Sequence, residues 1–264
     1  MTIKIGGRVG FDRTDELEKH FKGIDFPIEL ALPWKYHELW LPIENNINDI
    51  ISFFKSSSIT ILSIHATQGR ITDDAFLTWG KKTIEIAKEL GVKHIIVHPN
   101  HVHKEQRQTY QMKAVENLKK LSDETCTFSI ETFTGKSRVL RPMEIVDLEL
   151  PMTLDVAHIK DDQITYRIID KYWKNIKTVH LSAKNEKEHH LPIDIFCVKI
   201  LKKLYKLGWQ GNVILEYLPW HHYRVRNDIN ALNEHLFKGK PLKLLPYNDQ
   251  YKNNKDHYGF NEKL

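Results

Sequence analysis

The sequence predicts a single-domain α/β protein, a closed (β/α)8 TIM barrel. Short runs rich in Val, Ile and Leu alternate with segments of helical periodicity, eight times in all. Continuous apolar runs between helices are typical of parallel strands, because helices cover both faces of such a sheet. The length of 264 residues also fits one closed barrel. A doubly wound sheet is less favoured, since Gly6-Gly7-Arg8-Val9-Gly10 has the wrong spacing for a phosphate-binding fingerprint.

The eight predicted strands share an apolar interior and bounds set by polar or turn-forming residues. They are Ile3–Val9, Phe26–Pro33, Ile59–Thr67, His94–Asn100, Phe128–Phe133, Met152–His158, Ile176–Asn185 and Asn212–Pro219.

Eight helices are predicted between and after these strands, from apolar residues three and four positions apart. We expect Thr14 or Asp15 to cap the first helix and Gly91 to end the third. The helices are Thr14–Gly23, Pro42–Ser56, Asp73–Gly91, Lys104–Ser122, Arg141–Leu148, Asp162–Trp173, Asp194–Gly208 and Val225–Phe237. The barrel should therefore span residues 1–238, and residues 239–264, rich in Lys, Asn, Asp and Tyr, should form an irregular C-terminal tail.

Composition narrows the class of protein. No apolar stretch approaches the roughly 18 residues of a membrane span, and the N-terminus has no signal-peptide core. Two cysteines, Cys126 and Cys197, are too few for a disulfide framework or a thiolate zinc site, so we expect buried thiols and a cytoplasmic location. A net charge of +5 permits an anionic substrate without requiring one. The oligomeric state stays open.

Chemically active residues end seven of the eight predicted strands. The second run carries Glu29, and the others carry His65, His98, Glu131, Asp155 with His158, His180, and Glu216. In a parallel barrel the carboxyl ends of all strands meet at one mouth. Neutral imidazoles and carboxylates are the ligands that zinc, manganese and similar ions prefer. Taken alone, a strand-end His is more often a packing residue, but several carboxylates at one mouth would repel one another without a cation.

Two local motifs add ligand candidates. Asp155-x-x-His158 places a strand-end carboxylate close to an imidazole in the following loop. Glu188-His189-His190 follows His180, and the alternation of an extended segment puts Glu188 and His190 on one side. Both pairs are candidate metal ligands.

These motifs resemble the xylose isomerase-like TIM-barrel superfamily, which includes endonuclease IV and many sugar isomerases and epimerases, over residues 3–238. The resemblance implies a shared four-ligand core at Glu131, Asp155, His180 and Glu216. It further implies the extra ligands with which endonuclease IV holds three zinc ions. These fall on His65 in Ser63-Ile64-His65-Ala66, His98 in Val97-His98-Pro99, His158, Glu188 in place of Asp, and His190.

The chain departs from endonuclease IV at several positions. Arg8 stands where that family's first strand has His, and Ser182-Ala183 replaces the usual Asn-Asp. Glycines are missing after His190, and the tyrosine and arginine loops that open a DNA duplex have no clear counterpart. These departures leave the predicted barrel unchanged and leave the substrate open.

Two reaction classes follow. The first is a multinuclear zinc hydrolase that cleaves a phosphoester, with abasic-site DNA as substrate. In this enzyme the catalytic residues Glu131 and Glu216 would bridge metals and orient the nucleophile. The alternative is a mononuclear isomerase or epimerase of a sugar or sugar phosphate, using Mn²⁺ or Co²⁺, in which the two glutamates shuttle a proton through an enediolate. A binding protein with a vestigial site is disfavoured because no ligand position has been lost.

Substrate-binding candidates lie near the predicted mouth. Lys136 and Arg138 follow Glu131, with Arg141 close behind, and could hold a phosphate; a solvated loop explains them equally well. Trp34 follows the second strand and could stack on a sugar or base, although an ordinary packing role is as common for such aromatics.

Overall fold

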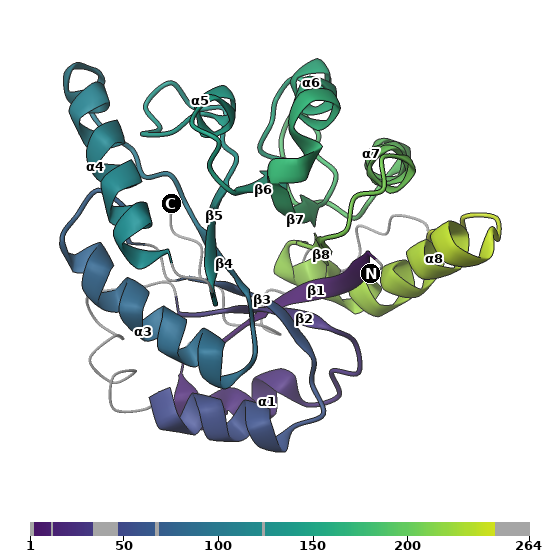
Figure 1. The fold of residues 1–264 in the computed structure, drawn as a ribbon. Helices are drawn as coiled ribbons and strands as arrows, with labels where there is room; N and C mark the ends of the chain where they lie inside the picture. The colour runs from purple at the N-terminus through teal and green to yellow at the C-terminus, as the bar shows by residue number, and fades with distance from the viewer. Residues whose placement is uncertain (1–2, 12, 34–46, 67–68, 123–124, 246–264) are drawn as a thin grey trace.

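A computed structural model describes residues 3–11, 13–33, 47–66, 69–122 and 125–245, and within them the chain forms a closed eight-stranded parallel barrel. The strands pair in chain order, β1 to β8, and β8 pairs with β1 to close the ring. Figure 1 shows the helices arranged around the outside of the strands. The predicted (β/α)8 TIM barrel is therefore confirmed.

The strands are short and almost wholly buried, as expected for a sheet covered on both faces. Their bounds are β1 Lys4–Gly10, β2 Ile28–Ala31, β3 Ile61–His65, β4 His94–Val97, β5 Thr127–Glu131, β6 Met152–Asp155, β7 Ile176–Leu181 and β8 Asn212–Leu215.

The helices occupy the predicted segments. They are α1 Leu17–Phe21, α3 Ala75–Glu89, α4 Arg107–Leu121, α5 Pro142–Asp147, α6 Asp162–Tyr172, α7 Ile195–Lys206 and α8 Val225–Lys238, and 3-10 turns cover Thr14–Glu16, Lys104–Gln106, Trp173–Asn175 and Pro219–Arg224. Residues 47–56 are also helical, while the first part of the predicted helix Pro42–Ser56 lies outside the described residues. After α8, residues 239–245 contain neither helix nor strand, and the rest of the predicted tail is not described.

The structure confirms the predicted end of the third helix and contradicts the predicted cap of the first. Gly91 follows α3 with a φ of 67°, a left-handed conformation that glycine adopts without strain. The expected cap at Thr14 or Asp15 is wrong, because Arg13 occupies that position without a side-chain capping bond. Asp15 instead accepts hydrogen bonds from the Arg13 guanidinium. The exposed ion pair replaces the cap.

A layer of small polar residues lies directly below the predicted ligands. Successive inward positions on a strand are two residues apart. The residues two positions before His65, Glu131, Asp155 and His180 are Ser63, Ser129, Thr153 and Thr178, each fully buried. Ser129 and Thr153 share a hydrogen bond of 2.7 Å between their hydroxyl oxygens. This polar layer forms the floor of the barrel mouth.

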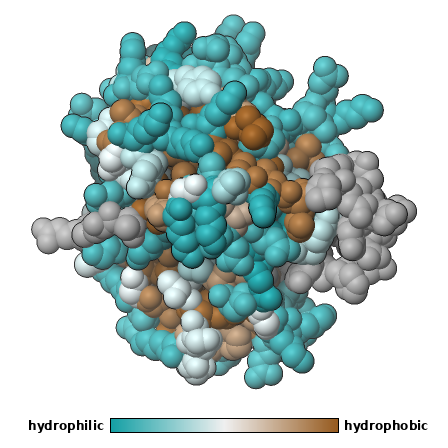
Figure 2. All heavy atoms as spheres, turned by 90° about the vertical axis from the view of Figure 1, so that its right-hand side faces the viewer, coloured by the Kyte–Doolittle hydropathy of each residue, from teal (hydrophilic) through white to brown (hydrophobic). Residues whose placement is uncertain are grey.

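One face of the molecule illustrates the polarity of its surface. The face in Figure 2, which is the right-hand side of Figure 1, is largely hydrophilic with smaller apolar areas between the polar side chains. Ile195 and Phe237, on α7 and α8, are among the exposed apolar residues. No described helix is both long enough and apolar enough to cross a membrane.

Glycine at position 6 is required by close contact between β1 and the chain entering β2. A Cβ atom there would stand 2.4 Å from the backbone oxygen of Pro27. We predict that Gly6→Ala lowers the free energy of unfolding by about 1–3 kcal/mol, because backbone must move to relieve the clash. Gly135→Ala is the control, since its Cβ would meet only the flexible Arg138 side chain, at 3.3 Å. Equal stability of both variants in denaturant titrations would contradict this account.

Candidate metal centre

The predicted ligands come from the carboxyl ends of strands β3 to β8 or from the loops just after them. His65, Glu131 and Asp155 are the last residues of their strands. His180 lies one residue before the end of β7, and the other ligands follow a strand: His98 after β4, and Glu216 after β8. The barrel topology therefore brings residues from distant parts of the sequence to one place.

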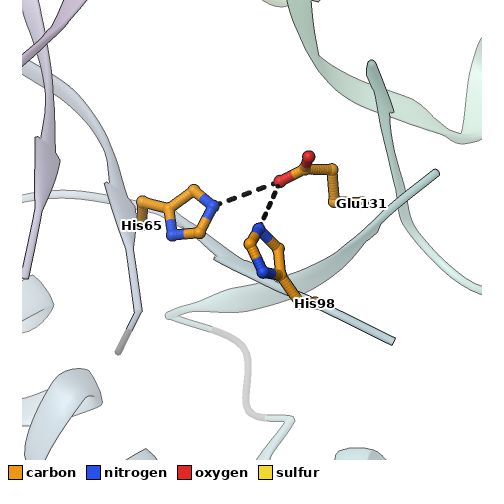
Figure 3. A group of neighbouring side chains, drawn as sticks. All are labelled: His65, His98 and Glu131. Carbon is orange, nitrogen blue, oxygen red and sulfur yellow. Dashed lines mark hydrogen bonds and ion pairs between the residues drawn. The ribbon is translucent and has the colours of Figure 1, made fainter. Parts of the chain in front are cut away.

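Two histidines converge on one carboxylate oxygen in the first ligand group. Nε2 of His65 lies 3.1 Å from Glu131 Oε2, and Nε2 of His98 lies 2.9 Å from the same oxygen. Figure 3 shows both rings directed at this carboxylate. His65 and Glu131 are almost completely buried. The three side chains present two imidazole nitrogens and a carboxylate, a donor set suited to zinc.

Four buried side chains form the second group, namely Glu131, Asp155, His180 and Glu216. Nδ1 of His180 lies 2.8 Å from Glu216 Oε2, 3.6 Å from Glu131 Oε2 and 3.8 Å from Asp155 Oδ2. A zinc ion with bonds of about 2.1 Å keeps tetrahedral ligand atoms about 3.4 Å apart. The observed separations lie on both sides of that value, so this group matches a mononuclear site by itself.

Asp155, His158 and His190 form the third group. Nδ1 of His158 lies 3.2 Å from Asp155 Oδ2, and Nε2 of His158 lies 3.1 Å from Nε2 of His190. His190 has a φ of 57°, a left-handed conformation that costs a non-glycine residue some strain. Its backbone oxygen accepts a hydrogen bond from the Leu218 amide, which links this loop to the one after β8.

Two carboxylates are shared between the groups. Glu131 belongs to the first and second groups, and Asp155 belongs to the second and third. The three groups therefore form a continuous chain of ligand sets connected by Glu131 and Asp155. Glu216, which was expected to share a metal bridge, belongs only to the second group.

Several buried ligand atoms make no hydrogen bond of good geometry with the described residues. They are Oε1 of Glu131, Oδ2 of Asp155, Nδ1 of His158, Nδ1 of His180 and Oε2 of Glu216. Buried polar atoms normally have partners, and an ion is one explanation for an exception. These five atoms lie in the ligand groups, and buried atoms elsewhere, such as Oε1 of Glu29, also lack such a bond among the described residues. The residues present fit a divalent metal.

The pKa shifts of the cluster show that its buried carboxylates and imidazoles compensate one another's charge. Burial alone would lower the pKa of His180, but the carboxylates of Glu29 and Glu131 raise it to about 9. Burial would raise the pKa of Glu131, yet the positive charges of His98 and His180 hold it well below its usual value. The site thus retains a proton on His180 in the absence of metal, and a metal would have to displace that proton.

Three of the candidate histidine ligands also have a partner at the second ring nitrogen, the one that faces away from the other ligands. Nδ1 of His65 lies 3.1 Å from the Ala66 carbonyl oxygen, and Nδ1 of His190 lies 3.3 Å from the Ser182 hydroxyl. Nε2 of His180 lies 3.1 Å from Glu29 Oε2. Such outer contacts fix the ring and determine which nitrogen can bind a metal.

Two charged residues at the mouth were not predicted as site residues. Arg8 forms an ion pair with Glu216 through its Oε1. Glu29 is completely buried against His180. Glu29 lies within the predicted strand Phe26–Pro33, and its position in an apolar run was the available signal. The replacement of His by Arg8 was visible in the sequence, but its partner depends on the register of β1 beside β8.

The sequence also predicts Glu188 as a metal ligand and Lys136, Arg138, Arg141 and Trp34 as substrate contacts. Glu188 is not in any of the three groups found among the described residues, so its role as a ligand stays a prediction. Arg138 is half-buried, with its guanidinium 4.1 Å from the centre of the Phe133 ring. Lys136 is exposed on the same loop. Trp34 lies outside the described residues. Arg141 is engaged with Glu144 at the start of α5.

Sequence comparison decides the family. A family model described as xylose isomerase-like TIM barrel matches residues 21–235. The chain belongs to this family. No curated protein sequence gives a significant match.

Several solved structures share the fold at low sequence identity. A D-tagatose 3-epimerase-like protein is 16% identical with a TM-score of 0.66, over 90% of this chain and 99% of that one. Endonuclease IV from Thermus thermophilus is 14% identical with a TM-score of 0.62, over 90% and 100% of the two chains. The IOLI protein, whose structure has a zinc atom bound, is 16% identical with a TM-score of 0.60, over 90% and 99%. At these identities the likeness establishes the fold alone.

The sharing of Glu131 between two groups predicts unequal losses of metal. Glu131→Ala should lower the bound zinc by more than His98→Ala does, because His98 belongs to one group and Glu131 to two. Elemental analysis of purified, zinc-saturated variants measures this directly. Glu89→Ala is the control, since Glu89 pairs with Lys55 on the surface. Equal losses in the two ligand variants, or full retention in Glu131→Ala, would show that the groups are assigned wrongly.

Proposed function

We propose that the protein is a divalent-metal-dependent phosphoester hydrolase with a multinuclear zinc centre, and that abasic-site DNA is the first substrate to test. The observation that carries the proposal is the linkage of three ligand groups through Glu131 and Asp155. A carboxylate can bridge neighbouring ions, and Glu131 and Asp155 each belong to two adjacent groups. A mononuclear isomerase needs the four-residue group only, with His158 as a substrate contact, and leaves His65, His98 and His190 without a role.

The protein residues supply binding and orientation. Metal ions a few Å apart would lower the pKa of a bound water and stabilise the leaving oxygen of a phosphoester. Glu131 presents one oxygen to His65 and His98 and the other to His158 Nδ1, at 2.9 Å. Glu131 therefore contacts histidines through both of its oxygens and would orient a bound water beside them.

The alternative is a mononuclear sugar or sugar-phosphate isomerase or epimerase, with Mn²⁺ or Co²⁺ as metal. The completeness of the four-residue group favours it, as does the presence of an epimerase-like protein among the fold neighbours. The ion pair between Arg8 and Glu216 weighs against it. Arg8 occupies Oε1 of Glu216, so this oxygen is not free to accept a substrate proton. Hydrolysis does not require Glu216 to accept one.

Arg138 is the residue we propose to contact an anionic group of the substrate. Its guanidinium rests on the Phe133 ring, and the other neighbours of that ring are metal-ligand candidates, His158 at 3.9 Å and His98 at 5.1 Å between centroids. It also donates a hydrogen bond to the Pro99 carbonyl oxygen. These contacts hold a cation beside the ligand groups, where it can bind a phosphate. Lys136 and Trp34 remain proposed substrate contacts on sequence grounds.

The reaction class can be decided with a substrate panel. The zinc-loaded protein should cleave DNA containing an abasic site, and cleavage should weaken as salt rises, because a polyanion is bound. Glu131→Gln should abolish turnover while leaving the fold intact, checked by circular dichroism. Ketoses and sugar phosphates with zinc, manganese and cobalt are run in parallel. Isomerisation of any sugar at a useful rate, with DNA left uncut, would refute the hydrolase proposal and support the alternative.

Arg138 and Arg141 provide a matched pair for the substrate-binding proposal. Arg138→Ala should raise KM for an anionic substrate by about tenfold, equivalent to about 1.4 kcal/mol, with metal content unchanged. Arg141→Ala should not change KM, because Arg141 is paired with Glu144. Steady-state kinetics and elemental analysis test both variants. A similar KM for Arg138→Ala and the unaltered protein would remove Arg138 from the proposed site.

A further inference from the structure

Glu29 is a buried carboxylate that belongs to none of the three ligand groups found in the described part of the chain. It lies in β2, in register with Arg8 of β1, and its exposed fraction is 0%. A carboxylate in such a place is costly unless it is paired and hydrogen-bonded. Its partners therefore indicate why it is there.

The contacts of Glu29 converge on one oxygen. Oε2 accepts a hydrogen bond of 2.8 Å from the Ser63 hydroxyl, and it lies 3.1 Å from Nε2 of His180. Arg8, the nearest cation in the sheet register, is ion-paired with Glu216 on the other side of β1. Glu29 is thus directed at the metal-ligand candidate His180, and Ser63, in the layer below, fixes its position.

The orientation of His180 follows from this contact. A carboxylate at Nε2 requires that nitrogen to carry a proton, which leaves Nδ1 as the nitrogen able to bind a metal. Nδ1 is also the atom that faces Glu216, Glu131 and Asp155. Both ring nitrogens are therefore assigned by independent contacts.

We infer that Glu29 is a positioning residue, which holds His180 so that Nδ1 binds the metal of the four-residue group and strengthens that bond by its negative charge. The outer partners of His65 and His190 are a carbonyl and a hydroxyl, both uncharged. Only His180, of these three, has a buried carboxylate as its outer partner. The four-residue group should consequently bind its ion first and most tightly. This inference rests on the proposed metal centre and is independent of the reaction class.

Zinc affinity provides the first test. Metal-free protein, Glu29→Gln and Ser63→Ala are titrated with zinc in competition with a chromophoric chelator. Glu29→Gln should weaken the tightest zinc site by about 10–100-fold, the usual effect of removing such an outer partner. Ser63→Ala, which keeps the carboxylate and removes one hydrogen bond, should weaken it much less. Unchanged tight binding in Glu29→Gln, or equal effects of the two substitutions, would overturn the inference.

A second measurement does not depend on the variants folding. In the unaltered protein loaded with cadmium, heteronuclear NMR with ¹⁵N-labelled histidine identifies the ring nitrogen that is coupled to the metal. We expect coupling to Nδ1 of His180 and a slowly exchanging proton on Nε2. Coupling to Nε2 would overturn the role of Glu29 and leave the metal centre intact. Cadmium bound nowhere near His180 would refute the proposed metal centre, and the inference with it.

Discussion

The mouth of this barrel depends on the balance of charge around four buried carboxylates. Glu29, Glu131, Asp155 and Glu216 are each less than a tenth exposed. Burial of an unpaired carboxylate costs several kcal/mol, so the cluster exists only if positive groups compensate it. Arg8 is permanently charged, and the histidines supply nitrogens that accept a proton or a metal. The polar floor of Ser and Thr hydroxyls adds dipoles but no charge.

Strand register explains how these charges are interleaved. β1 lies between β8 and β2, and the pairing sets Arg8 opposite Glu29 while Gly7 pairs with Leu215, the residue before Glu216. One guanidinium therefore stands between two carboxylates. On the other side of β8, His180 lies in register with Asp155 of β6. The order of charged groups and imidazoles around the ring follows from the residue that each strand places at the barrel mouth.

Much of this arrangement could be predicted from the sequence, because strand ends of a parallel barrel always meet. His65, Glu131 and Asp155 were placed correctly at strand ends by the apolar runs before them. The partners of Arg8 and Glu29 could not be derived, since they depend on register between strands far apart in the chain. The sharing of Asp155, instead of Glu216, between ligand groups depends on the direction of each side chain, which no sequence pattern specifies. The predicted cap at Thr14 or Asp15 failed because a local ion pair with Arg13 competed for the same carboxylate.

The central claim is that the three linked ligand groups bind separate ions. A crystal structure of the zinc-saturated protein, with anomalous diffraction data collected at the zinc absorption edge, tests it most directly. The account predicts anomalous peaks beside each group, with Glu131 between the first two and Asp155 between the second and third. A single peak, held by Glu131, Asp155, His180 and Glu216 alone, would contradict the multinuclear centre.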